Sequence, residues 1–171
     1  RSAVHVLPRP RRRPDPRGRL RRVRSIGARF HVRRSTIDVR RMLERINERI
    51  EALYDRDHCI GHAYFTALRD VDDGADRFTK LADVFRNRIV PLLEEYFFED
   101  WRKIRLVLGD NQKPDVASQF VGESDAHEQD LTMLFGNDHG LDSYATKRRY
   151  SLQDSAFTHP AAYIGIYQAA A

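Results

Sequence analysis

One apolar stripe at helical spacing constrains the fold of this chain more than any other feature. Apolar or aromatic residues recur every three or four positions, namely Val39, Met42, Leu43, Ile46, Ile50, Leu53 and Tyr54. The opposite face carries arginine and glutamate in mixture, which is typical of a solvated surface. Ser35 and Asp38 precede the stripe at the spacing of a capping box. We therefore predict a long amphipathic helix that begins at Ser35.

Further helical patterns follow the first one. After an acidic turn at residues 55–58, the run from Ile60 to Leu68 predicts a short helix, and residues 70–76 predict a linker. The apolar stripe returns from residue 77 onward, where Pro91 is expected to kink or split the helix. We predict that residues 94–108 continue as helix up to Gly109, which is a suitable C-cap. The fold class is mainly α.

Charge divides the chain into two unequal parts. Residues 1–34 contain 13 arginines and one acidic residue, a balance of +12. The remaining 137 residues contain 30 − 13 = 17 basic and 25 − 1 = 24 acidic residues, a balance of −7. Arginine alternates with proline in the first part, and we expect disorder up to about Arg24 because few apolar residues are available for a core. This arm is either a clamp for nucleic-acid phosphates or a truncated or misread remnant.

The last third, residues 110–171, forms a separate segment in composition. It is rich in Asp, Gly, Asn and Ser, and its regular structure is hard to predict. Tyr150 to Leu152 predict a short strand, and an aromatic tail around Tyr163 and Tyr167 is expected to dock back on the helices. We thus expect three parts: an arm at 1–34, a helical unit at 35–109 and an irregular extension at 110–171.

Several site classes find no support in the sequence. The single cysteine, Cys59, excludes an internal disulfide and is expected to be a small buried residue in a cytoplasmic protein. His58 and His62 are spaced i, i+4 but lack a third ligand at a telling distance, so no metal site is predicted. No window is apolar enough to span a membrane. The sequence also lacks the phosphate loop and the paired acids of a nucleotide-hydrolysing core.

Three stretches together carry a family resemblance. They are residues 47–50, the string from Ile60 to Phe65, and residues 84–93, which read VFRNRIVPLL. Together they resemble the helical lid of McrB-like AAA+ motors, the GTPase subunits of modified-cytosine restriction systems. The resemblance spans residues 36–108, with weaker similarity at 150–167. It implies a helical lid subdomain with a small irregular C-terminal extension.

The resemblance also implies a function. A lid of this family closes over GTP or ATP with Mg²⁺ held by an AAA+ core domain, and it transmits hydrolysis to neighbouring ring subunits. An McrC-like nuclease partner then restricts DNA, which the lid itself does not read. By this interpretation the chain is a fragment of the motor that binds no nucleotide and is inactive alone. The sequence does not decide between GTP and ATP.

Five residues are the candidates for a role in that motor. A helix start at Gly61 and His62 would present backbone amides to an anion, and the resemblance places Ile60, Gly61, His62 and Tyr64 near the nucleotide. Arg29, followed by Phe30, is similar to the end of the family's Arg-Arg-Phe stretch, which implies a finger toward a neighbouring subunit's nucleotide.

Two alternatives belong to other functional classes. The chain could be a standalone helical module whose arginine arm binds nucleic acid without catalysis, which predicts steep salt dependence that is lost without residues 1–34. It could also be a protein that caps an intact ring, which predicts a complex with a full-length relative.

Overall fold

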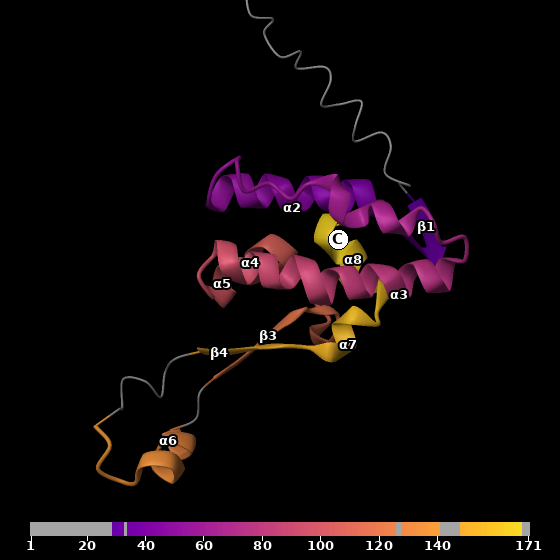
Figure 1. Ribbon diagram of the computed structural model, residues 1–171. Coiled ribbons are helices and arrows are strands. Elements are labelled where there is room, and N and C mark those ends of the chain that lie inside the picture. Colours follow the sequence, from indigo (N-terminus) through magenta and orange to yellow (C-terminus); the bar gives the residue numbers. More distant parts are fainter. Residues whose placement is uncertain (1–28, 33, 126–127, 141–147, 169–171) are drawn as a thin grey trace, which may run out of the picture.

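A β-hairpin leads directly into the first long helix. The computed structural model describes residues 29–32, 34–125, 128–140 and 148–168. In it, β1 (Arg29–Val32) pairs antiparallel with β2 (Ser35–Asp38), and α2 (Val39–Leu53) follows (Figure 1). The predicted helix start at Ser35 is wrong, because the Asp38 carboxylate accepts the Arg41 amide at 3.0 Å and caps the helix one turn later.

The apolar stripe of α2 lies in the core, as its spacing predicts. Five of its members are buried: Val39, Met42, Leu43, Ile46 and Ile50. Leu53 is partly buried and packs against the same core, whereas Tyr54 at the C-cap is 43% exposed. The helix therefore ends where the stripe reaches the surface.

The second long helix runs through the predicted proline break. The 3-10 helix η1 (His62–Leu68) leads to α3 (Gly74–Val84), the π-helical turn η2 (Phe85–Ile89) and α4 (Val90–Tyr96), which follow one another without a gap. Pro91 neither splits nor ends this helix. Instead the amide of Val90 donates to the Phe85 carbonyl five residues earlier, so the hydrogen-bond register changes just before the residue that has no N–H.

A tight turn interrupts the predicted helix at residues 94–108. Phe98 and Glu99 adopt left-handed backbone angles, with φ of 51° and 59°, and α5 (Trp101–Leu108) begins after Asp100 caps it. The prediction of one uninterrupted helix is therefore wrong. The Gly109 C-cap is confirmed, since this glycine has φ 71° and its amide donates to the Arg105 carbonyl.

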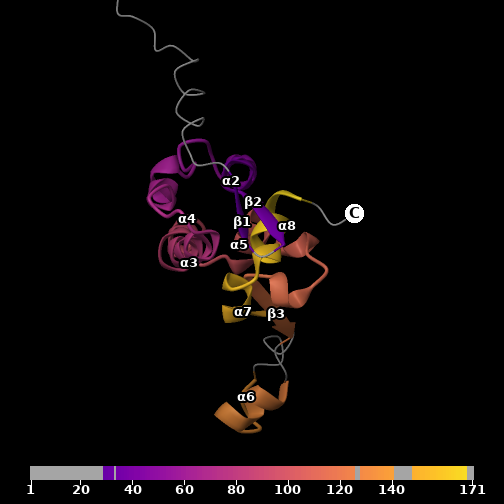
Figure 2. The ribbon, with the colours of Figure 1, turned by 90° about the vertical axis from the view of Figure 1, so that its right-hand side faces the viewer.

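The C-terminal segment combines short helices with a projecting ribbon. The 3-10 helices η3 (Asp110–Gln112) and η4 (Val116–Ser118) precede β3 (Val121–Asp125), and β3 pairs antiparallel with β4 (Arg148–Leu152). Between these strands, α6 (Glu128–Phe135) lies at the far end of the ribbon, away from the helical body (Figure 2). The chain continues through α7 (Asp154–Phe157) and α8 (Pro160–Tyr167).

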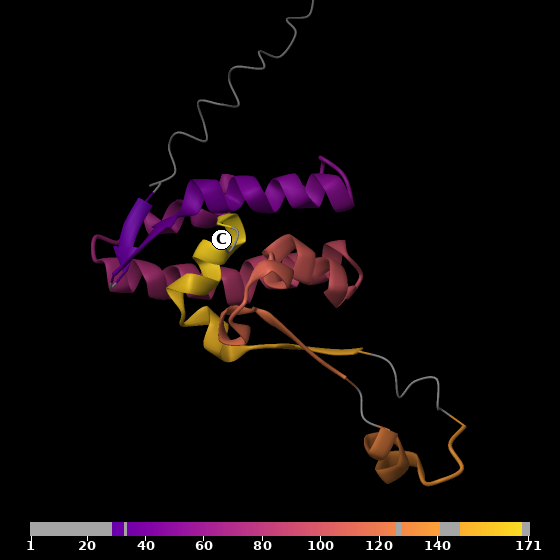
Figure 3. The ribbon, with the colours of Figure 1, turned by 180° about the vertical axis from the view of Figure 1, so that it is seen from behind.

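The last helix fills the centre of the core. α8 lies between α2 and α3 (Figures 1 and 3), where the Tyr163 ring packs edge-on against Phe78 and Phe85 with centroids 5.3 and 5.0 Å away. The Tyr167 hydroxyl accepts the Asp38 amide at 3.1 Å. Phe120, Val121 and the buried residues of α7 and α8 therefore share one core with α2 and α3.

Two remaining predictions concern the N-terminal arm and membrane-spanning segments. The predicted disordered arm, residues 1–24, lies outside the described residues. Within the described residues, no helix has the length and apolar character that crossing a membrane requires.

Candidate functional site

An aspartate organises the turn that follows α2. One oxygen of the Asp55 carboxylate, Oδ1, accepts the amides of Asp57 and His58 at 2.8 and 3.0 Å and lies 2.7 Å from His58 Nδ1. The hydrogen bond from His58 holds the pKa of Asp55 below its usual value. The His58 ring meets Tyr54 and Tyr96 edge-on, with centroids 4.2 and 4.9 Å away. The His58 ring is thus engaged in a hydrogen bond and in ring packing. These contacts do not favour a metal site formed by His58 and His62.

A single amide side chain fixes the start of the candidate segment. Asn47 Oδ1 accepts the Ile60 amide at 2.7 Å, and Asn47 Nδ2 donates to the Ile60 carbonyl at 3.0 Å. Ile60 itself is 3% exposed. Because both backbone groups of Ile60 bond to a side chain of α2, Gly61 and the residues after it begin from a fixed position.

The four candidates in this segment divide into one internal and three surface residues. Ile60 is buried, whereas Gly61 and Tyr64 are exposed and His62 is half-buried. Gly61 is extended, with φ −75° and ψ 150°, and is followed by a 3-10 helix of seven residues that has no side-chain cap. The expected helix start at Gly61 and His62 is present as a 3-10 helix, and such a short segment has a weaker aligned dipole than a longer α-helix.

Tyr64 does line an open groove of about 570 Å³. One wall comes from η1, through Ala63, Tyr64 and Ala67. The other comes from α3 and the π-helical turn, through Lys80, Asp83, Val84, Asn87 and Arg88. Two cations, one carboxylate and a phenol ring thus surround a partly apolar floor. Such a lining suits an anionic or aromatic group and supplies no pair of carboxylates for Mg²⁺.

Sequence reasoning missed the far wall of this groove. Residues 84–93 contributed to the predicted helix and to the family resemblance, but Lys80 and Arg88 received no role. The signal was present as four cations in the run from Arg77 to Arg88. Two of these cations, Lys80 and Arg88, line the groove, and their relative placement depends on the π-helical turn, which shifts the residues after it relative to an unbroken α-helix.

Arg29 lies at the other end of α2, in β1. Its Nε donates to the second oxygen of Asp38, Oδ2, at 2.7 Å, while the side chain stays 64% exposed. Burial would raise the pKa of Asp38, but the amide of Arg41 and the Arg29 guanidinium outweigh it and hold that pKa below its usual value. Arg29 thus joins the hairpin to the start of α2, and neither its ion pair nor its hydrogen bond involves the Ile60 to Tyr64 segment.

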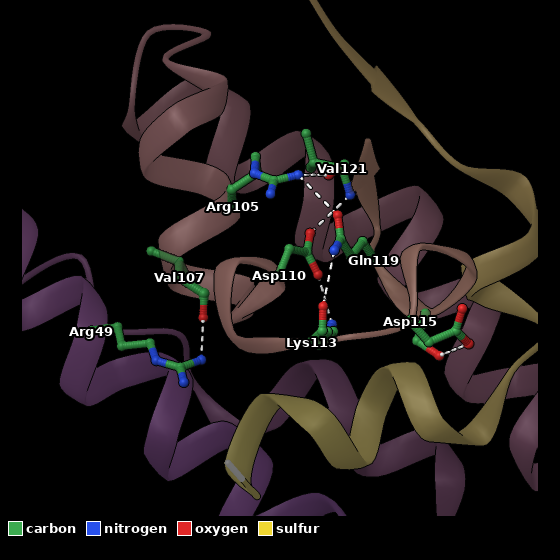
Figure 4. A network of polar contacts seen from close by, with 9 residues as sticks. Arg49, Arg105, Val107, Asp110, Lys113, Asp115, Gln119 and Val121 are labelled. Carbon is green, nitrogen blue, oxygen red and sulfur yellow. Dashed lines mark hydrogen bonds and ion pairs between the residues drawn. The ribbon is translucent and has the colours of Figure 1, made fainter. Parts of the chain in front are cut away.

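A buried polar network at the end of α5 also escaped sequence reasoning (Figure 4). Lys113 Nζ lies 2.7 Å from Asp110 Oδ1, with the two side chains 3% and 0% exposed, and Asp110 Oδ2 accepts the Val121 amide. Arg49 of α2 donates to the Val107 carbonyl at 3.0 Å. Burial lowers the pKa of Lys113. The network ties α2, α5 and the base of β3 together, and it is a structural rather than a catalytic cluster.

The described residues contain no group of three or more His, Cys, Asp or Glu arranged to hold a metal ion. Cys59 is half-buried, its thiol lies 3.8 Å from the Asn47 carbonyl, and burial raises the pKa of that thiol. These features give Cys59 a packing role in the turn.

Comparison with known proteins bears on the helical part of the chain. Residues 38–105 match the family model described as the alpha-helical lid domain of McrB. The matched region runs from the cap of α2 into α5. It includes Asn47, which bonds to the backbone of Ile60, the Ile60 to Tyr64 segment and both walls of the groove. No curated protein matches the chain. The match covers less than half of the 171 residues, so residues 38–105 are similar to the helical lid region of McrB.

Proposed function

We propose that residues 38–105 act as the lid of an McrB-like AAA+ NTPase and close over GTP or ATP bound with Mg²⁺ by a core domain. The observation that carries this proposal is the family match across the groove and its anchoring residues. In this role the lid contributes no hydrolytic group. The core would hold the phosphates and the metal, and the lid would cover them.

The groove between η1 and α3 is the face that we assign to the nucleotide. Gly61, His62 and Tyr64 reach the surface from a segment that Asn47 holds in place. Lys80 and Arg88 on the opposite wall complement the negative charge of a nucleotide. Lid closure would therefore bring two cations and one aromatic ring toward the bound nucleotide without any catalytic residue from this chain.

We further propose that the partners are the core domain, neighbouring ring subunits and an McrC-like nuclease, with DNA contacted only through the assembly. Arg29 is the candidate for a contact with a neighbouring subunit's nucleotide. Its guanidinium is anchored at Nε by Asp38 and is 64% exposed, so its other nitrogens can donate further hydrogen bonds.

The test uses the full chain, isotope-labelled, together with a separately produced McrB-like core domain. We expect the NMR signals of Gly61, His62 and Tyr64 to shift when the core carries GTP or ATP with Mg²⁺, and to stay in place when nucleotide is added without the core. The nucleotide that produces the shift identifies GTP or ATP.

A hydrolysis assay supplies the matched control. Tyr64→Ala should reduce nucleotide hydrolysis by the assembly about tenfold or more, whereas Thr66→Ala, an exposed position on the same 3-10 helix, should leave it unchanged. Equal effects of both variants, or shifts confined to residues outside the groove, would contradict the assignment.

A further inference from the structure

The turn between α4 and α5 holds an exposed aromatic ring on a strained backbone. Phe98 is 83% exposed, and Phe98 and Glu99 have φ of 51° and 59°. A left-handed backbone is unfavourable for both residue types, whereas glycine adopts it without a steric cost. Strain of this kind clusters at functional sites. The exposed ring gains little from packing in its own fold, so its position suits a contact with another segment.

Phe98 borders an open groove whose charge is entirely negative. The groove has a volume of about 540 Å³ and is lined by Pro91, Glu94, Glu95, Phe98 and Glu99. No Lys or Arg is among these lining residues. Within the part of the chain that the structure describes, none of the three carboxylates forms an ion pair. An occupant of this groove must therefore supply positive charge and a group that packs on the ring.

Arginine meets both requirements, and the segment that precedes β1 is rich in it. Residues 1–28 contain ten arginines and one acidic residue, Asp15. A guanidinium donates hydrogen bonds to carboxylates in a planar fork, and it also stacks on aromatic rings. Residues 9–13 read RPRRR, which is the highest density of positive charge in the segment. This run complements the three carboxylates of the groove.

The chain before β1 is long enough to bring this run to the groove. Gly74, at the start of α3, lies against the His31 carbonyl of β1, and α4 lies at the opposite end of the helical body from β1 (Figures 1 and 3). The helical path from Gly74 to Tyr96 is about 35 Å long at 1.5 Å per residue. An extended chain spans up to about 53 Å between Arg13 and Arg29, so the run reaches the groove of its own chain.

We propose that the arginine run at residues 9–13 docks in the groove beside the α4–α5 turn of the same chain. Glu94, Glu95 and Glu99 accept hydrogen bonds from its guanidinium groups, and one guanidinium stacks on the Phe98 ring. The groove that we assign to the nucleotide is lined by η1, α3 and η2, whereas the docking groove is lined by α4 and the turn after it. The docking contact therefore does not rest on the proposed lid function.

Paramagnetic broadening of NMR signals in the full, isotope-labelled chain tests the contact. Cys59→Ser removes the native thiol, and Pro14→Cys, next to the arginine run, carries a nitroxide. We expect the signals of Phe98 and Glu99 to broaden and to recover at about 1 M salt, because salt screens exposed charges. No broadening at the groove overturns the proposal. Equal broadening when nitroxide and isotope label are on different chains assigns the contact to a second copy, which also overturns it.

Matched charge variants show whether the groove itself is the site. Glu95→Gln with Glu99→Gln should remove most of the broadening at Phe98. Asp70→Asn with Asp72→Asn removes the same charge from an exposed acidic loop at the other end of the helix, and it should leave the broadening unchanged. Equal effects of the two pairs would show a general attraction between the basic segment and an acidic surface, and would overturn the assignment to the groove.

Phe98→Gly separates docking from stability. Glycine adopts the left-handed backbone without strain, and the Phe98 ring is exposed, so this variant should unfold at the same temperature as the parent or at a higher one. It should nevertheless show weaker broadening at Glu99, because the ring that stacks on a guanidinium is gone. A lower unfolding temperature would show that the ring serves the fold, and undiminished broadening would show that it does not hold the run. Either result overturns the proposal.

Discussion

At the scale of single residues, Asn47 has more structural effect than its half-buried position indicates. Its side chain supplies hydrogen-bond partners for the backbone amide and carbonyl of Ile60, which lie in neither a helix nor a sheet. The residue stands in one of the stretches that carry the family resemblance, yet a lone asparagine on a helix gives no sequence signal for a bond to a backbone 13 positions away. The position of the whole Gly61 to Tyr64 segment depends on it.

Replacing Asn47 should therefore destabilise the protein. We expect Asn47→Ala to lower the free energy of unfolding by about 1–3 kcal/mol, since it leaves a buried amide and carbonyl without partners. Asn47→Asp should cost less because it keeps the acceptor for the Ile60 amide. Urea unfolding of the two variants measures the difference, and an unchanged midpoint for Asn47→Ala would contradict the role given to this residue.

Asp38 gives the protein a defined acid sensitivity. Its pKa in the folded state lies below the ordinary 3.8, so its contribution to stability is fully present above that value and is lost as the pH falls through the folded pKa. Asparagine also caps helices but cannot ionise. Asp38→Asn should therefore fold and show a smaller loss of stability below about pH 4. Urea unfolding at a series of pH values from 2 to 7 checks this, and identical pH profiles would exclude the effect.

At the scale of elements, the helices could be predicted from the sequence, but the turns between them and the changes of hydrogen-bond register within them could not. The stripe of α2 follows from residue spacing alone, and the left-handed Gly109 follows from glycine's freedom at positive φ. Pro91 was expected to kink or split a helix, and a π-helical turn just before it moves one hydrogen bond and keeps the helix from being split. A break at Phe98 and Glu99 was not expected, because neither residue type favours a left-handed backbone. The groove could not be predicted either, because its far wall includes that π-helical turn.

The junction of α5 with β3 depends on one buried ion pair. Asp110→Ala leaves the Lys113 ammonium buried without its carboxylate and should cost about 3–5 kcal/mol of unfolding free energy. The double variant Asp110→Ala, Lys113→Met removes both charges and should cost clearly less than Asp110→Ala alone. Denaturant unfolding of both proteins decides this, and equal losses would show that the ion pair is not the source of the effect.

At the scale of the whole molecule, the region that matches the McrB lid is not a closed unit by itself. The family match ends at residue 105, yet the core between α2 and α3 is completed by α8, from residue 160 to 167. Aromatic residues in the tail indicated docking, but its place against two helices 76 to 128 positions earlier in the chain had no sequence signal. Long-range packing of this kind depends on side-chain shape, which spacing does not reveal.

Tyr163 is the residue on which this closure can be tested. Tyr163→Ala should lower the free energy of unfolding by about 3–5 kcal/mol, because it leaves a cavity among Phe78, Phe85 and Phe120. Tyr163→Phe keeps the ring and removes only the hydroxyl that donates to the Phe157 carbonyl at 3.0 Å, and it should cost about 1 kcal/mol. Thermal or urea unfolding measures both, and a small effect of alanine would show that α8 is dispensable.

The central position of α8 also sets an order of events during protein synthesis. At about 5–20 residues per second, a ribosome needs about 3–12 s to extend the chain from Leu108 to Tyr167. During that interval the inner faces of α2 and α3 lack the helix that separates them from water. The nascent chain therefore presents an apolar cleft to chaperones before α8 emerges, and mutations in α8 would reduce the yield of folded protein even where residues 38–105 are intact.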